Sequence, residues 1–173
     1  MSPADDSWEI RNAEFDVDDR DRFLSELRRI ARDAGATIVC FNADNLAGRR
    51  HAESAIRHAL RSWNTGSAVA NSFEMEALLF ASGNRQCSVA SSFGVHSGHN
   101  HAYICCCPAV AGIWDALALM VQYAGEPGDH LSAERRARLK ELFSVSDDEI
   151  SAAGESSFTD LILERVALLA VYR

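Results

Sequence analysis

The segment 102–107, with the sequence AYICCC, restricts the fold more than any other part of the chain. It is apolar throughout, is short for a helix, and is closed by Pro108, which cannot donate to a continuing sheet ladder. A strand that is apolar on both faces is typical of the middle of a sheet. Successive side chains of a strand alternate between its faces, so Cys105 and Cys107 point one way and Cys106 the other. We therefore interpret the three cysteines as small buried side chains of a central strand.

Local patterns predict the other elements. Strands are expected at 8–15 and 36–41, and a loop rich in Gly, His and Asn at 94–101. Asp16 or Asp18 is expected to cap the first helix, and Gly35 to end it. Helices are expected at 16–35, 49–63, 73–82, 110–124, 132–143, 147–153 and 157–171, with a short one from Gln86.

These elements predict an α/β (α+β) fold. The sheet should be small, mixed or antiparallel, with three or more strands flanked by helices, and the C-terminus should be helical. The chain has 173 residues and no internal repeat or long linker, so a single domain over 1–173 is expected.

Cysteine usage and hydropathy bear on the compartment. Five cysteines are an odd number, three of them adjacent, and we find no secretory signal ahead of them. The longest apolar run, 109–124, is shorter than a bilayer span and contains Asp115 and Gln122. We expect a cytoplasmic protein with no membrane partner.

The formal net charge of −8 taken as a whole disfavours a nucleic-acid partner. The charges are unevenly placed, however, because residues 46–100 hold five arginines against three acids. Exposed charges are screened beyond about 8 Å at physiological ionic strength, so a local basic strip can attract phosphate. Nucleic-acid binding therefore stays open.

Common catalytic motifs are missing from the sequence. There is no phosphate-binding GxxxxGK loop, no GxGxxG after an expected strand and no GxSxG nucleophile elbow. Ser97 lies near His96, but adjacency in sequence is not the geometry of a nucleophile and its base. We expect no catalysis, no cofactor and no small-molecule substrate of its own.

Histidines and cysteines lie close together in one stretch, and both are ligands that zinc prefers. The histidines are His96, His99 and His101, and three cysteines follow them. Because consecutive cysteines of a strand cannot converge on one ion, we favour a solvated histidine loop with no metal. A small metal-dependent or nucleotide-modifying enzyme centred on this loop is the alternative function.

The helix expected from Arg49 separates an apolar face from a basic one. Arg50, Arg57 and Arg61 lie together on the basic side, and we call these three residues the arginine strip. Such a strip is able to meet successive phosphates. The alternative is an ordinary solvated helix face.

The turn 81–86, with the sequence ASGNRQ, adds a second functional signal. Gly83 and Asn84 tolerate the left-handed backbone that ends one helix, and the next helix should begin with free N–H groups near Arg85 and Gln86. A corner of this kind suits an anionic or base-edge ligand.

Several segments together resemble a known family, the kinase-binding accessory subunit of the KEOPS tRNA-modification complex (TPRKB-like, archaeal type). The most specific are the Ser-Gly-x-Arg-Gln turn at 82–86 and the Val-Ala-Leu-Leu ending at 166–169, and Cys87 stands where an aliphatic residue is expected. Residues 1–35 match only in pattern. The segments are FNA at 41–43, AGRRH at 47–51, ANS at 70–72, EALL at 76–79, ASGNRQ at 81–86 and LERVALL at 163–169.

The resemblance implies a mixed α/β adaptor without catalysis of its own. Its partners would be the kinase-like ATPase subunit of KEOPS and the single-stranded 3′ CCA end of tRNA, in support of threonylcarbamoyladenosine (t6A) modification. The family motif supports the turn and Arg49-Arg50, whereas the rest of the arginine strip is our inference from helical geometry. The expected RNA-binding residues are Arg49, Arg50, Arg57, Arg61, Asn71, Gly83, Arg85 and Gln86.

The last helix is apolar on too many sides for one buried stripe, which indicates burial on two sides. One side should pack within the fold and the other on the kinase-like subunit. The expected kinase-interface residues are Leu161, Leu163, Val166, Leu168 and Leu169. A fully internal helix is the alternative for this segment, and an adaptor that binds the kinase without RNA is a further alternative for the function.

Overall fold

The computed structural model describes residues 7–126 and 130–172. They group into two compact units. The described residues of the first, which we call the sheet unit, are 7–42 and 94–126, and those of the second, the helical unit, are 43–93 and 130–172. The expectation of one domain over 1–173 stays a prediction. In the part of the chain that the structure describes, no helix is both long and apolar enough to cross a bilayer.

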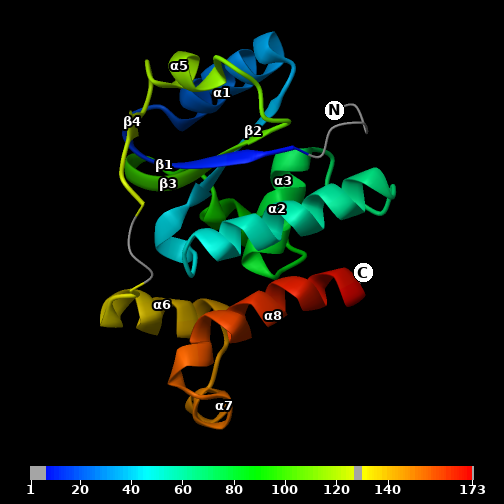
Figure 1. Cartoon of the computed structure of the whole chain (residues 1–173), viewed down its shortest axis with the longest axis vertical. Helices are drawn as coiled ribbons and strands as arrows, with labels where there is room; N and C mark the ends of the chain where they lie inside the picture. The colour runs from blue at the N-terminus through cyan, green and yellow to red at the C-terminus, as the bar shows by residue number, and fades with distance from the viewer. Residues whose placement is uncertain (1–6, 127–129, 173) are drawn as a thin grey trace. The chain divides into compact units, whose positions relative to one another are not determined.

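The sheet unit contains a four-stranded antiparallel sheet in the order β2-β3-β1-β4 (Figure 1). The predicted fold class is confirmed, and the strand that carries the three cysteines is one of the two inner strands. The strands are β1 (Glu9–Val17), β2 (Thr37–Asn42), β3 (Gly98–Cys107) and β4 (Gln122–Tyr123). Helix α1 (Arg20–Ala34) connects β1 to β2, and helix α5 (Ile113–Leu117) lies between β3 and β4.

Helices α1 and α5 cover the same face of this sheet (Figure 1). The core beneath them takes alternate strand residues such as Phe15, Ile104 and Cys106, while Cys105 and Cys107 occupy the opposite face and are also buried. Burial raises the pKa of the Cys106 thiol to about 12, so this cysteine stays protonated and behaves as a small apolar side chain.

Three expectations for this unit are wrong. The cap of α1 is Asp19, whose carboxylate accepts from Arg22 N–H, rather than Asp16 or Asp18. The strand β3 begins at Gly98, so the second half of the expected loop at 94–101 is paired with β1.

The third error concerns 110–124, which is not one helix. Gly112 has a left-handed backbone (φ 82°) and begins a helix of only five residues. Beyond it, Tyr123 pairs with Ala13 of β1, and the Tyr123 hydroxyl donates to the Trp114 carbonyl at 2.5 Å. Pairing with a strand from the start of the chain therefore diverts this apolar segment into β4.

The helical unit is built around the hairpin of α2 (Arg49–Asn64) and α3 (Phe73–Ser82). The bounds of α3 are as predicted, because Ser72 caps its start and Gly83 ends it with a left-handed backbone. The other elements are η1 (Ala43–Asn45), α4 (Cys87–Ala90), η2 (Ser91–Phe93), α6 (Ala133–Phe143), α7 (Asp147–Ala153), η3 (Glu155–Ser157) and α8 (Phe158–Val171).

Candidate functional site

The turn that follows α3 is held by its own side chains. Ser82 Oγ donates to the Leu79 carbonyl at 2.9 Å and accepts from Asn84 N–H at 3.2 Å. Asn84 Oδ1 accepts from Gln86 N–H at 2.8 Å. These bonds fix the backbone and leave the side chains of Arg85 and Gln86 exposed.

The turn corrects one expectation. The N–H of Gln86 is not free, because it donates to Asn84 Oδ1. The following helix α4 has only four residues. The turn therefore offers a ligand its exposed Arg85 and Gln86 side chains rather than a helix N-terminus.

His51 connects the start of α2 to the end of α3 beneath this turn. Its Nδ1 accepts from Ala47 N–H at 3.1 Å, and its Nε2 donates to the Ala81 carbonyl at 2.8 Å. The ring is fully buried, and burial lowers its pKa from 6.5 to about 4. The neutral ring thus holds Arg49 and Arg50, which begin α2, close to the turn.

Gly83 brings the turn into contact with α8. A Cβ placed on Gly83 would lie 3.4 Å from the Arg165 carbonyl oxygen, so the turn backbone packs directly on the helix backbone. The Arg165 side chain binds Glu149 of α7, and this hydrogen bond is the main cause that lowers the pKa of Glu149 to about 2. Arg165 is therefore a junction between the turn, α7 and α8.

The arginine strip is exposed on α2, as helical geometry predicted. Arg50 reaches α8, where its Nη2 lies 3.2 Å from Asp160 Oδ1. The side chains of Arg50 and Asp160 are 67% and 60% exposed, which makes this a weak, solvated ion pair.

A single acid serves two other arginines of this helix. Glu53 lies 3.1 Å from Arg49 Nε and 3.6 Å from Arg57 Nη2. Sequence spacing gave a signal for this, since Glu53 is four residues from each arginine and shares a helix face with both. Glu53 was nevertheless not among the predicted site residues, and Asp160, which lies 110 residues beyond Arg50, has no such spacing.

The expected RNA-binding residues gather at two places. Arg49 and Arg50 lie near the turn that carries Arg85, whereas Asn71 precedes α3 and lies at its opposite end. The ten residues of α3 separate Asn71 from the turn by about 15 Å. Asn71 is exposed near the end of α2 that carries Arg61.

The last helix, α8, has one buried face and two half-exposed flanks. Val166 and Leu169 are buried within the helical unit, together with Phe158 and Ile162. The other expected kinase-interface residues, Leu161, Leu163 and Leu168, are half-buried and lie on the flanks. The leucines of the flanks are therefore open to contact from outside the helical unit, whereas Val166 and Leu169 are already buried within it.

The histidines and cysteines do not form the zinc site that their sequence order suggested. All three cysteines are buried in β3, and His96 bonds to the carbonyl of its neighbour Ser97. His99 and His101 are exposed to solvent, as expected. The expectation of a loop is wrong for these two residues, because both belong to β3 and pair with residues of β1.

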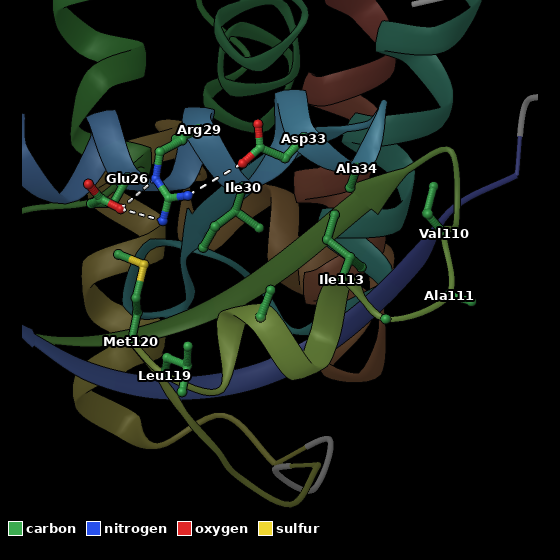
Figure 2. A pocket seen from close by; sticks show the side chains of 12 residues that line it. Glu26, Arg29, Ile30, Asp33, Ala34, Val110, Ala111, Ile113, Leu119 and Met120 are labelled. Atoms are coloured by element: carbon green, nitrogen blue, oxygen red, sulfur yellow. Dashed lines mark hydrogen bonds and ion pairs between the residues drawn. The ribbon is translucent and has the colours of Figure 1, made fainter.

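The sheet unit has a pocket of about 590 Å³ between α1 and the segment 110–120 (Figure 2). Ile30, Ile113 and Met120 supply apolar lining. At the rim, Arg29 lies between Glu26 and Asp33 and is ion-paired with both. This lining suits an apolar group, because its charges are directed at one another.

The geometry thus brings together the turn, the start of the arginine strip and α8, all within the helical unit. No protein-family model and no curated protein sequence matches this chain. The contact between Gly83 and Arg165 joins the segments 81–86 and 163–169, which are two of the segments that carry the KEOPS resemblance.

Proposed function

We propose that this chain is a non-catalytic, cytoplasmic adaptor of a KEOPS-type complex. It binds the kinase-like ATPase subunit through α8 and the 3′ CCA end of tRNA through the turn 82–86 and α2, in support of t6A modification. The observation that best supports this is the packing of Gly83 on the backbone of Arg165. Because of that contact, a ligand on the turn and a partner on α8 act on adjacent parts of one unit.

The RNA side depends on exposed cations beside a rigid turn. Arg85 and Gln86 project from a backbone that three internal hydrogen bonds hold, so only their side chains, and not the turn itself, must become ordered on binding. The exposed ion pairs of the neighbouring arginines contribute little to stability, and a phosphate replaces their acids readily. A basic groove with a fixed edge is typical of proteins that hold single-stranded tails.

The kinase side depends on the half-exposed leucines of α8. Leu161 and Leu168 follow one flank of the helix, and Leu163 lies on the other. Val171, near the end of the helix, is 71% exposed. Apolar side chains at these positions gain free energy when a partner removes them from water.

Binding of tRNA with and without its CCA end tests the RNA side. We expect deletion of the three nucleotides to weaken binding at least about tenfold, because each stacked base contributes about 1–3 kcal/mol. Arg85→Ala should weaken binding of intact tRNA and have no further effect on the truncated tRNA. The matched control is Arg138→Ala, which removes an exposed arginine of α6 outside the site.

Equal affinity for both tRNAs would overturn the RNA assignment. The chain would then be an adaptor that binds the kinase alone, with Arg49, Arg50 and Arg57 left in their ion pairs with Glu53 and Asp160. Co-purification with the kinase-like subunit, measured in the same preparations, separates that outcome from failure of the whole proposal.

A further inference from the structure

Four polar side chains gather on one face of the sheet unit, at the Gly98 end of β3. Glu14 and Asp16 come from β1, and His99 and His101 from β3. In the antiparallel register Glu14 lies opposite His101 and Asp16 opposite His99. All four are exposed, whereas the residues between them, such as Phe15, are buried on the other face.

Three of these side chains place ligand atoms close together. One ligand atom from each of Glu14, His99 and His101 can be chosen so that all three lie within 4.8 Å of one another. The Nε2 atom of His101 is 3.6 Å from Glu14 Oε1, and that of His99 is 4.0 Å from Glu14 Oε2. The two imidazole rings are 4.9 Å apart and nearly perpendicular, at 89°.

The fourth side chain orients one of the ligands. Nδ1 of His99 is 3.0 Å from Asp16 Oδ1, and a carboxylate accepts a hydrogen bond, so Nδ1 carries the proton. In the neutral ring, Nε2 of His99, which lies 4.0 Å from Glu14 Oε2, then keeps its lone pair. A carboxylate that binds the outer nitrogen of a ligating histidine is the usual support of a metal-bound imidazole.

We propose that Glu14, His99 and His101 bind a single divalent transition-metal ion, with Zn²⁺ as the reference ion and Asp16 as the outer support of His99. Two imidazoles and a carboxylate suit Zn²⁺ and its neighbours in the first row, and water completes a tetrahedral shell. Metal bonds of about 2.0–2.1 Å place ligand atoms about 3.3 Å apart. Small rotations of exposed side chains close the present distances to that value.

This proposal does not depend on KEOPS function, because the site lies in the sheet unit and uses none of the proposed RNA or kinase residues. A simpler arrangement of the same residues is a set of exposed polar contacts between two histidines and two acids that holds no metal. The two arrangements differ in their affinity for a metal. They also differ in whether the loss of Asp16 lowers that affinity.

Calorimetric titration of tag-free full-length chain with ZnCl₂ tests the site. The protein carries Cys87→Ser, because the exposed thiol of Cys87 is a competing zinc ligand. We expect one Zn²⁺ per chain. His99→Ala and His101→Ala should each abolish binding or weaken it more than about 100-fold, and Asp16→Asn should weaken it about 10–100-fold.

His96→Ala is the matched control, since His96 lies in the same segment but contacts Ser97 instead of Glu14. It should leave zinc affinity unchanged. Titration with CoCl₂ gives a second readout, because visible absorption of bound Co²⁺ reports ligand geometry. Absence of 1:1 binding, or binding that survives His99→Ala and His101→Ala together, would overturn the proposal.

Discussion

At the scale of single residues, His51 shows how a buried polar group sets the conformation around it. A fully buried imidazole is costly unless both nitrogens are paired. Here one nitrogen accepts and the other donates, which the neutral ring alone can do. The two hydrogen bonds that satisfy the ring also hold the start of α2 beside the turn after α3.

The stability of the protein should therefore fall in mild acid. The pKa of His51 is about 4 in the folded chain against 6.5 for an ordinary histidine. Between these values the unfolded chain binds a proton that the folded chain does not, so the free energy of unfolding decreases as the pH falls from about 6.5 to about 4. The full difference amounts to about 3 kcal/mol.

Urea unfolding at a series of pH values checks this, with His51→Gln as the reference. The variant should be less stable at pH 7 by about 1–3 kcal/mol, because the buried Ala47 N–H or the buried Ala81 carbonyl loses its hydrogen-bond partner. A plot of its unfolding free energy against pH should lack the decrease between pH 6.5 and 4 that titration of His51 causes. Parallel curves for the two proteins would contradict the assignment.

At the scale of helices and strands, prediction succeeded where the signals were local. Ser72 and Gly83 cap α3 within the sequence itself, so its bounds followed from the residues alone. The prediction of one helix over 110–124 was wrong because the structure of this segment depends on β1, about 100 residues earlier, with which β4 pairs. Local periodicity carries no information about such a partner.

The candidate site divides in the same way. The arginine strip was predictable, because side chains three, four and seven positions apart share a helix face. The pairing of Arg50 with Asp160 and of His101 with Glu14 was not, since both join distant segments. The sequence therefore predicts which side chains one helix exposes, but not which oppositely charged side chains from distant segments pair with them.

Substitution at Gly83 tests the contact between the turn and α8. Asparagine tolerates a left-handed backbone, so Gly83→Asn changes mainly the packing on Arg165. Gly66→Asn is the control, because Gly66 has a similar backbone (φ 68°) and open space around its Cβ position. We expect a loss of about 1–3 kcal/mol in unfolding free energy at Gly83. At Gly66 the change should stay within about 0.5 kcal/mol.

Charge placed on α8 tests the kinase surface. Leu168→Glu puts a carboxylate on a half-exposed flank, where the fold tolerates it but an apolar interface does not. Co-purification with the kinase-like subunit should be lost while the circular dichroism spectrum is retained. Leu142→Glu on α6 is the control, since Leu142 is 39% exposed outside the proposed surface, and it should still co-purify.

At the scale of the whole molecule, the net charge of −8 gives no sign of the local arginine strip. The salt dependence of RNA binding reports the strip directly. If about three phosphates of a single strand are contacted, log Kd against log salt has a slope of magnitude about 2. Arg57→Ala should reduce this slope by about 0.7, because one contact is removed. A slope near zero would show that the arginines do not meet phosphate.

The contrast in burial among the cysteines has a practical consequence. Cys87 is exposed directly after Gln86, and the other four cysteines are buried. A maleimide dye added to the native protein therefore attaches at one position, beside the turn, without any engineered substitution. Fluorescence from that dye follows ligand docking at Arg85 and Gln86, and the rise from one reactive thiol to five records global unfolding in the same sample.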